Sequence, residues 1–308
     1  MLVTRGLPAT ADSAVALTIG NFDGVHRGHQ AMLARLAEAA EDLALPAAVM
    51  TFEPLPREFF ARGQAPARLS SLSSKLDVFR RCGVARTFVL RFDERLARME
   101  PAGFVALLVE RIGARWLLVG DDFRFGRQRA GNLAFLREHA RTFSVEAMKT
   151  VEVDGERVSS TAVRAALAAG ELERAARLLG RRYTIRGRVA HGRKLGRTLG
   201  FPTANIVLKR RHALSGIFAV RVHGLPGGSR DGVASLGVRP TVASQGEPLL
   251  EVYILDFDDN IYGRRIAVEF LHKLRDEARF PDLATLTRQI EADVRDARRY
   301  LESAAAPA

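Results

Sequence analysis

Cysteine is almost absent from this chain: Cys82 is the only one in 308 residues. A single thiol cannot form an internal disulfide, and it excludes zinc sites that need several thiolates. The N-terminal segment also lacks the basic stretch, apolar run and small-residue cleavage site of a secretory signal. We therefore expect a protein of the reducing cytoplasm.

Long apolar runs are also missing, since no stretch of 18 or more apolar residues occurs, so we expect no membrane span and no membrane partner. Hydrophobic residues make up 47% and charged residues 27% of the chain, as in ordinary soluble globular proteins. A chain of 308 residues is long for one core and favours two domains. We expect a monomer or a transient homo-oligomer.

The formal charge of +12 has several explanations. A basic protein can bind nucleic acid, a membrane surface or small polyanions such as ATP, and an arginine-rich composition can equally follow genome bias. The basic residues occur as scattered pairs, such as Arg181-Arg182 and Arg298-Arg299, with no nucleic-acid motif beside them. We expect no nucleic-acid partner, although charge alone does not decide the function.

The first half of the chain alternates buried strand patterns with helical ones. Strands are predicted at 15–19, 48–52, 87–90, 116–119 and 145–151, and helices at 30–40, 74–81, 104–112, 133–140, 161–169 and 171–179. Such alternation predicts a parallel sheet covered on both faces, with ligands beyond the carboxyl ends of the strands.

The second half changes character. Strands rich in β-branched residues are predicted at 183–190, 216–223, 231–236, 250–255 and 266–271, followed by an amphipathic helix from Leu283 to Leu301. Strands without helices between them predict an antiparallel barrel, against which the final helix can pack. We place the domain boundary at 181/182, which gives domains 1–181 and 182–305.

The first chemical motif, GNFDGVHRGH, spans residues 20–29 and directly follows the first strand. Its glycines permit close backbone approach to a ligand, and a helix N-terminus attracts phosphate. His26 and His29 lie three residues apart where the helical pattern begins, so both can donate hydrogen bonds to phosphate oxygens. A metal site is the weaker interpretation, because no third ligand is identifiable nearby.

GNFDGVHRGH resembles the HxGH signature of the nucleotidyltransferase superfamily, and its flanks resemble bacterial bifunctional riboflavin kinase/FAD synthetases. Three other segments agree: FEPLPREFF (52–60), although many members carry His where Leu55 stands, VGDDFRFG (119–126), and SSTAVR (159–164). The resemblance covers nearly the whole chain. It implies an N-terminal Rossmann-like nucleotidyltransferase domain with a parallel sheet, and a C-terminal antiparallel β-barrel of riboflavin kinase type with a final helix.

The implied N-terminal reaction is transfer of an adenylyl group from ATP to FMN, which yields FAD and pyrophosphate. The resemblance implies catalytic roles for His26, His29 and Arg164. The implied nucleotide- and flavin-binding residues are Gly20, Phe22, Asp23, Gly24, Gly28, Asp122, Phe123, Arg124, Phe125, Ser159, Ser160 and Thr161.

Several of these residues have simpler interpretations from the sequence alone. SSTAVR is also an ordinary helix cap. Asp122 and Arg124 are also compatible with a surface ion pair, and Phe123 and Phe125 are either core residues or flavin contacts. These alternatives remain open at this point.

The second motif, GRVAHGRKLGRTLGFPTANI, spans residues 187–206 and contains Gly192, Gly196 and Gly200. It is neither a Walker A loop nor a Rossmann fingerprint, and a glycine-rich hairpin is the simpler interpretation of its residues. GFPTAN, however, resembles the PTAN motif of riboflavin kinases. The resemblance implies that Gly192, Gly196, Gly200 and Pro202 bind nucleotide, and that Thr203 and Asn205 ligate Mg²⁺.

The implied C-terminal reaction is phosphorylation of riboflavin by ATP. Its nucleophile is a neutral alcohol, for which a carboxylate base is useful. Glu251 aligns with the catalytic Glu of riboflavin kinases, although an isolated acid on a strand is commonly just solvent-facing. KLRDEARF (273–280) resembles the family's flavin-side flap, which implies flavin contacts for Arg275 and Phe280.

Other classes of function explain less of the sequence. A nucleic-acid-binding protein explains the charge but neither phosphate motif. A single-activity adenylyltransferase explains HxGH but leaves GFPTAN and Glu251 without a role.

Overall fold

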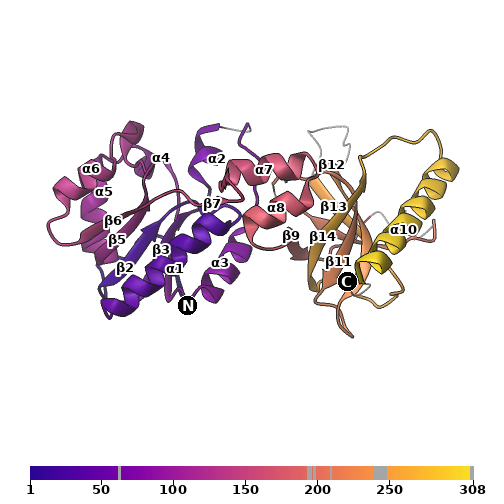
Figure 1. Ribbon diagram of the computed structural model, residues 1–308, viewed down its shortest axis with the longest axis horizontal. Helices are drawn as coiled ribbons and strands as arrows, with labels where there is room; N and C mark the ends of the chain where they lie inside the picture. Colours follow the sequence, from indigo (N-terminus) through magenta and orange to yellow (C-terminus); the bar gives the residue numbers. More distant parts are fainter. Residues whose placement is uncertain (62–63, 193–195, 197–198, 209, 239–247, 306–308) are drawn as a thin grey trace. The chain divides into compact units, whose positions relative to one another are not determined.

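The computed structural model describes residues 1–61, 64–192, 196, 199–208, 210–238 and 248–305. The chain forms two compact units: Met1–Pro66 with Ser70–Ser160, and Ala67–Leu69 with Thr161–Ala308 (Figure 1). This division falls inside the SSTAVR segment, earlier than the boundary that we predict at 181/182, which stays a prediction.

The first unit contains a six-stranded sheet in the order β1-β4-β3-β2-β5-β6, with every neighbouring pair parallel. Its strands are β1 Leu2–Arg5, β2 Val15–Ile19, β3 Ala47–Phe52, β4 Arg86–Leu90, β5 Ala114–Gly120 and β6 Ser144–Met148, and a short hairpin adds β7 Glu152–Val153 and β8 Glu156–Arg157. Its helices are α1 Arg27–Asp42, α2 Pro56–Ala61, α3 Leu72–Arg81, α4 Glu94–Ala97, α5 Pro101–Leu107 with a π-helical continuation Leu108–Ile112, and α6 Leu133–His139.

Helices cover both faces of this sheet, which explains why β2 and β3 are buried along their whole length. Helices α1 and α3 contribute Leu36 and Phe79 to one core. Helices α5 and α6 contribute Phe104 and Leu136 to the core on the other face (Figure 1). The predicted parallel sheet with two covered faces is confirmed.

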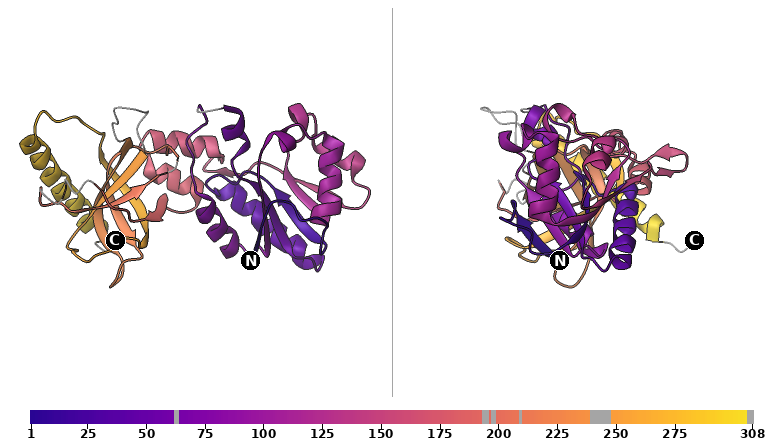
Figure 2. Two further views of the ribbon diagram at one scale, coloured as in Figure 1. Left: turned by 180° about the vertical axis from the view of Figure 1, so that it is seen from behind. Right: turned by 90° about the vertical axis from the view of Figure 1, so that its left-hand side faces the viewer.

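The second unit contains a six-stranded antiparallel sheet in the order β10-β13-β12-β11-β14-β9. Its elements are α7 Ser160–Ala168 (Ser160 itself belonging to the first unit), α8 Leu172–Leu179, β9 Thr184–Arg188, β10 Thr203–Val207, β11 Gly216–His223, β12 Arg230–Val238, β13 Pro248–Ile254, β14 Arg265–Arg275 and α10 Leu283–Ala305. A bridge between Ala190 and Asn205 brings the two edge strands together, so the sheet approaches a closed barrel. Helix α10 packs against the outside of this barrel through Ala297 and Leu301 (Figure 2).

Candidate active sites

The first site lies where the strand order of the parallel sheet reverses. The chain proceeds from β2 outward to β3 and β4, and then returns to place β5 on the other side of β2. Ligands of open α/β sheets bind beyond the carboxyl ends of the strands at such a point. GNFDGVHRGH follows β2 and VGDDFRFG spans the end of β5, so the fold brings these two motifs to one edge of the sheet.

The loop between β2 and α1 is held in a strained conformation. Phe22 and Val25 have φ angles of 48° and 41°, in a region that non-glycine residues rarely adopt. The Gly24 N–H donates to Ser70 Oγ at 2.9 Å, and the Ser160 hydroxyl donates to the Asp23 carbonyl at 2.9 Å. Such strain is commonly found at ligand sites, where the surrounding structure maintains it.

His26 and His29 stack face to face at the start of α1. Their ring centroids lie 3.7 Å apart at an interplanar angle of 18°. His26 caps the helix, because its Nδ1 accepts the His29 backbone N–H at 3.4 Å. Gly28 allows this packing, since a Cβ at that position would lie 3.3 Å from the His26 ring.

The environment of His29 keeps its imidazole neutral. Burial is the main reason why the pKa of His29 lies well below its usual range, and electrostatic repulsion from His26 and Lys75 lowers it further. Its Nδ1 is buried and has no hydrogen-bond partner among the described residues. A neutral imidazole with an unsatisfied ring nitrogen is suited to hydrogen bonding with a ligand.

A cavity of about 670 Å³ opens at the carboxyl ends of β2, β3, β4 and β5. Its lining contains all four predicted residues of the β5 loop: Asp122, Phe123, Arg124 and Phe125. Phe125 is a buried core residue and Phe123 packs against the same core, which confirms the core interpretation. Both residues also line the cavity, and their contact with flavin stays a prediction. Asp122 pairs with Arg157 at 3.3 Å, and the part of the chain that the structure describes shows no Asp122–Arg124 ion pair.

Sequence reasoning missed the aromatic wall of this cavity. Phe92, just beyond β4, contacts Phe52 and Phe60 edge to face, with ring centroids 5.8 and 5.7 Å away. These three phenylalanines line the cavity together with Asn21. Phe52 and Phe60 belong to the FEPLPREFF segment, whereas Phe92 belongs to no motif. Its position just after a strand is the one sequence feature that could have indicated it.

The SSTAVR residues fall in both compact units. Ser160 reaches the first loop through the Asp23 carbonyl, while Thr161 and Arg164 belong to the second unit. Arg164 Nε donates to the Ala67 carbonyl at 2.6 Å. The helix predicted at 161–169 is confirmed as α7, which begins one residue earlier, at Ser160.

The second site is a row of polar residues on the outer face of the barrel. Asn205 of β10 is the register partner of Glu251 on β13, and Glu251 is the partner of Ser235 on β12. Paired residues of antiparallel strands point to the same face, so these three side chains are neighbours. Glu251 is half-buried and shares this face with Tyr253, which packs with α10.

Asn205 has an oxygen that is available for a ligand. Its Nδ2 donates to the Thr203 carbonyl at 3.1 Å and lies 3.4 Å from Thr203 Oγ1. Its Oδ1 is buried and has no hydrogen-bond partner among the described residues. A buried neutral oxygen beside a threonine hydroxyl fits the oxygen ligands of Mg²⁺.

Two of the predicted loop glycines make close contacts at this site. A Cβ on Gly192 would lie 2.6 Å from Asn205 Nδ2, so the loop needs glycine to pass over that amide. A Cβ on Gly196 would lie 2.3 Å from the Phe201 carbonyl, beside which Gly200 adopts a φ of 85°. Pro202 follows and leads directly into β10.

The predicted flavin contacts Arg275 and Phe280 lie together, with the Arg275 guanidinium 5.7 Å from the centroid of the Phe280 ring. Arg275 forms a two-pronged ion pair with the buried Asp293 of α10, at 2.7 and 2.8 Å. Sequence reasoning missed this anchor, and it also missed Glu277, whose carboxylate lies against Gly237. Burial there raises the pKa of Glu277.

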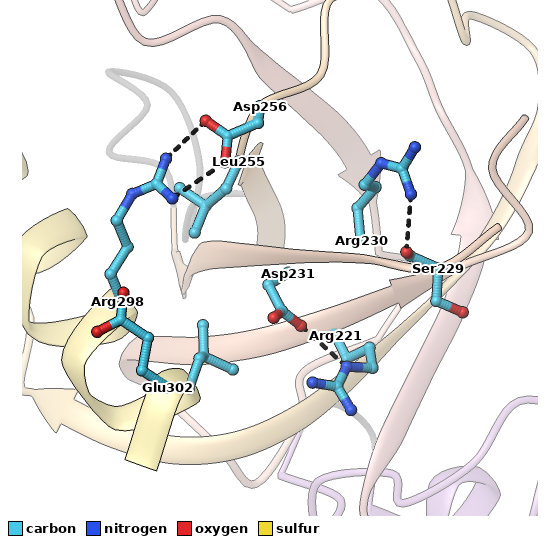
Figure 3. Close-up of a pocket in the computed structure, with 9 residues that line it drawn as sticks. Arg221, Ser229, Arg230, Asp231, Leu255, Asp256, Arg298 and Glu302 are labelled. Carbon is cyan, nitrogen blue, oxygen red and sulfur yellow. Dashed lines mark hydrogen bonds and ion pairs between the residues drawn. The ribbon is translucent and has the colours of Figure 1, made fainter. Parts of the chain in front are cut away.

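Another cavity of about 710 Å³ lies on the barrel beside α10 and contains no predicted site residue. Figure 3 shows two ion pairs among its lining residues, Arg298 with Asp256 and Arg221 with Asp231. Within the described ranges, no cluster of three or more His, Cys, Asp or Glu side chains is arranged to hold a metal ion. No helix among the described residues has both the length and the apolar character required to cross a membrane.

Comparison with known proteins matches the two halves separately. Residues 9–162 match the FAD synthetase family, and residues 179–301 match the riboflavin kinase family. The chain is 53% identical to the bifunctional riboflavin kinase/FMN adenylyltransferase of Pseudomonas fluorescens, over 91% of each chain. It is 46% identical to the protein of that name from Escherichia coli strain K12, over 97% of this chain and 98% of that one.

A solved structure is also similar. The crystal structure described as a macrolide-efflux protein from Streptococcus pneumoniae superposes with a TM-score of 0.80 at 28% identity, and the match covers 97% of this chain and 99% of that one.

Proposed function

The chain belongs to the family of bifunctional riboflavin kinase/FMN adenylyltransferases, and from that premise we propose how its residues divide the two reactions. The protein phosphorylates riboflavin to FMN and adenylylates FMN to FAD, with ATP as the donor in both steps. We infer a functional boundary at 181/182, close to residue 179, where the riboflavin kinase match begins.

In the N-terminal reaction, an FMN phosphate oxygen attacks the α-phosphorus of ATP. A new P–O bond forms, the bond to the bridging oxygen breaks, and pyrophosphate leaves. The nucleophile is already an anion, so no general base is needed and catalysis depends on alignment and charge stabilisation. His26 and His29 donate to the phosphate oxygens, and the low pKa of His29 supports a neutral donor.

The remaining N-terminal residues position the substrates. The flavin lies in the aromatic cavity between Phe92 and the Asp122–Phe125 loop, whose shape and apolar walls suit a planar ring system. Ser159, Ser160 and Thr161 bind phosphate at the start of α7, and Arg164 stabilises the leaving pyrophosphate.

In the C-terminal reaction, the terminal ribityl hydroxyl of riboflavin attacks the γ-phosphorus of ATP. Glu251 accepts the hydroxyl proton, and ADP leaves. Asn205 Oδ1 and Thr203 Oγ1 would hold Mg²⁺, which reduces the charge repulsion of the phosphates when it is bound. The observation that best supports this site is the register pairing of Glu251 with Asn205.

We also infer that the protein works in the cytoplasm as a monomer or transient homo-oligomer, without nucleic-acid or membrane partners. The single cysteine and the scattered basic pairs support this inference.

The test of this function supplies the purified protein with riboflavin, ATP and Mg²⁺ and follows the flavins by chromatography. FMN should appear first and FAD afterwards. A folded protein that converts neither riboflavin nor FMN would contradict the proposal.

A further inference from the structure

Lys75 on α3 is a charged residue in an unusual place. Its side chain is fully buried, with 0% exposure, whereas lysine is almost never buried to this extent. Its Nζ donates to the Asn21 carbonyl at 3.0 Å, in the loop that carries the paired histidines. Moving an ammonium group out of water is costly, which suggests that its charge serves the site beside it.

Lys75 and Phe79 lie on the same face of α3, since residues four apart on a helix are neighbours. Both contact the strained part of that loop. The Phe79 ring contacts the buried Phe22 ring edge to face at 5.2 Å. Phe22 in turn contacts the His29 ring at 5.0 Å. Lys75 binds the carbonyl of the residue just before Phe22. Helix α3 therefore contacts both the ring of Phe22, which has a positive φ angle, and the backbone that precedes it.

The charge of Lys75 also acts on His29. Among the described residues, the titratable groups that shift the pKa of this imidazole are His26 on its own turn and Lys75 on α3. The carboxylate of Asp23, in the same loop, accepts the Ser70 N–H at 3.1 Å. Lys75 and His26 both help burial to lower the pKa of His29. A fixed cation at this position favours negative charge on a ligand and disfavours a second proton on the histidines.

We propose that Lys75 is a positioning residue for adenylyl transfer, which holds the strained histidine loop and places a fixed positive charge behind it. This inference rests on the proposed function of the N-terminal site. A buried cation needs no reorganisation while negative charge develops on the transferring phosphorus group, which is how preorganised sites lower barriers.

The test compares Lys75→Met with Lys149→Met, which removes the same charge from an exposed position of the same unit. FAD formation from FMN and ATP is measured across pH 6 to 9, and the ring signals of His26 and His29 are titrated by NMR without substrate. Lys75→Met should slow FAD formation about 10- to 100-fold and raise the pKa of His29. Lys149→Met should change neither, and riboflavin phosphorylation should survive in both variants as an internal check of folding.

A second variant keeps the proposal testable if Lys75→Met fails to fold. Lys75→Gln retains a hydrogen-bond donor for Asn21 but removes the charge, so it should still raise the pKa of His29. A His29 titration that matches the wild type in a folded, uncharged variant would overturn the proposal. Because this titration needs no substrate, it distinguishes failure of the Lys75 role from failure of the adenylyltransferase assignment.

Discussion

Asn205 of β10 lies directly opposite Glu251 of β13 in the antiparallel register, on the barrel face that α10 partly covers. The pair combines a buried amide oxygen, which has no hydrogen-bond partner in the part of the chain that the structure describes, with a half-buried carboxylate. A ligand oxygen for a cation and a base for an alcohol are the two groups that phosphoryl transfer to riboflavin requires.

Replacement of the proposed base should affect one reaction only. Glu251→Gln should lower kinase turnover by about 10² to 10⁴, the usual contribution of general base catalysis. FMN adenylylation should be mostly intact, because the paired histidines proposed to catalyse it lie in the other unit. Rates measured separately with riboflavin and with FMN check this, and an equal loss of both activities would instead indicate a folding defect.

Replacement of His29 should instead affect adenylylation and leave the kinase reaction intact. His29→Ala removes a donor aimed at the phosphate oxygens and should slow FAD formation by roughly 10² to 10³. Riboflavin phosphorylation by the same sample serves as the control. Adenylylation at close to the wild-type rate would exclude His29 from the catalytic apparatus.

The role of Gly192 in the kinase site can be tested by adding a single methyl group at this position. In Gly192→Ala, the added Cβ would lie 2.6 Å from Asn205 Nδ2, so the loop or the amide has to move. A displacement of this kind should reduce kinase turnover by about 10- to 100-fold. Steady-state kinetics with riboflavin measure the loss, and unchanged kinase activity would show that Gly192 is not part of the site.

Acid should destabilise the N-terminal unit through His29. Burial lowers the pKa of this imidazole in the folded state, whereas the unfolded chain takes up the proton near pH 6.5. The contribution to stability is therefore complete above about pH 6.5 and is lost as the pH falls from there toward the lowered folded pKa.

Trp116 lies on β5, so the fluorescence of the chain's one tryptophan reports on this unit. Urea unfolding followed at this residue should show a steeper loss of stability below pH 6.5 in the wild type than in His29→Gln. Identical pH dependence in the two proteins would contradict the assigned pKa direction.

Most of the fold was predictable because its strands follow simple patterns. β2 and β11 occur at the predicted residues, since each is a β-rich run bounded by a change in pattern. β1 was missed because it is a four-residue strand with an exposed Leu2, and its pairing with β4 is a long-range contact that no local pattern reveals. β10 was missed because its first three residues belong to the GFPTAN motif, which follows a glycine-rich loop.

Site residues were predictable where they belong to a sequence motif. They were not predictable where only the packing of the folded chain brings them together. The His26–His29 pair is evident from spacing on a helix start, and the structure stacks the two rings. The aromatic wall at Phe92 and the Asp293 anchor of Arg275 join segments far apart in the chain, and neither has a local signature. The burial of Lys75 is a property of the folded unit, so no local pattern revealed it.

The central claim is that one chain carries two independent nucleotide sites, and complementation tests it most directly. Neither Glu251→Gln nor His29→Ala alone should make appreciable FAD from riboflavin and ATP. A mixture should make it, because FMN released by His29→Ala is a substrate for Glu251→Gln. A mixture of folded variants that forms no FAD, or a Glu251→Gln protein that cannot use added FMN, would contradict two separate sites.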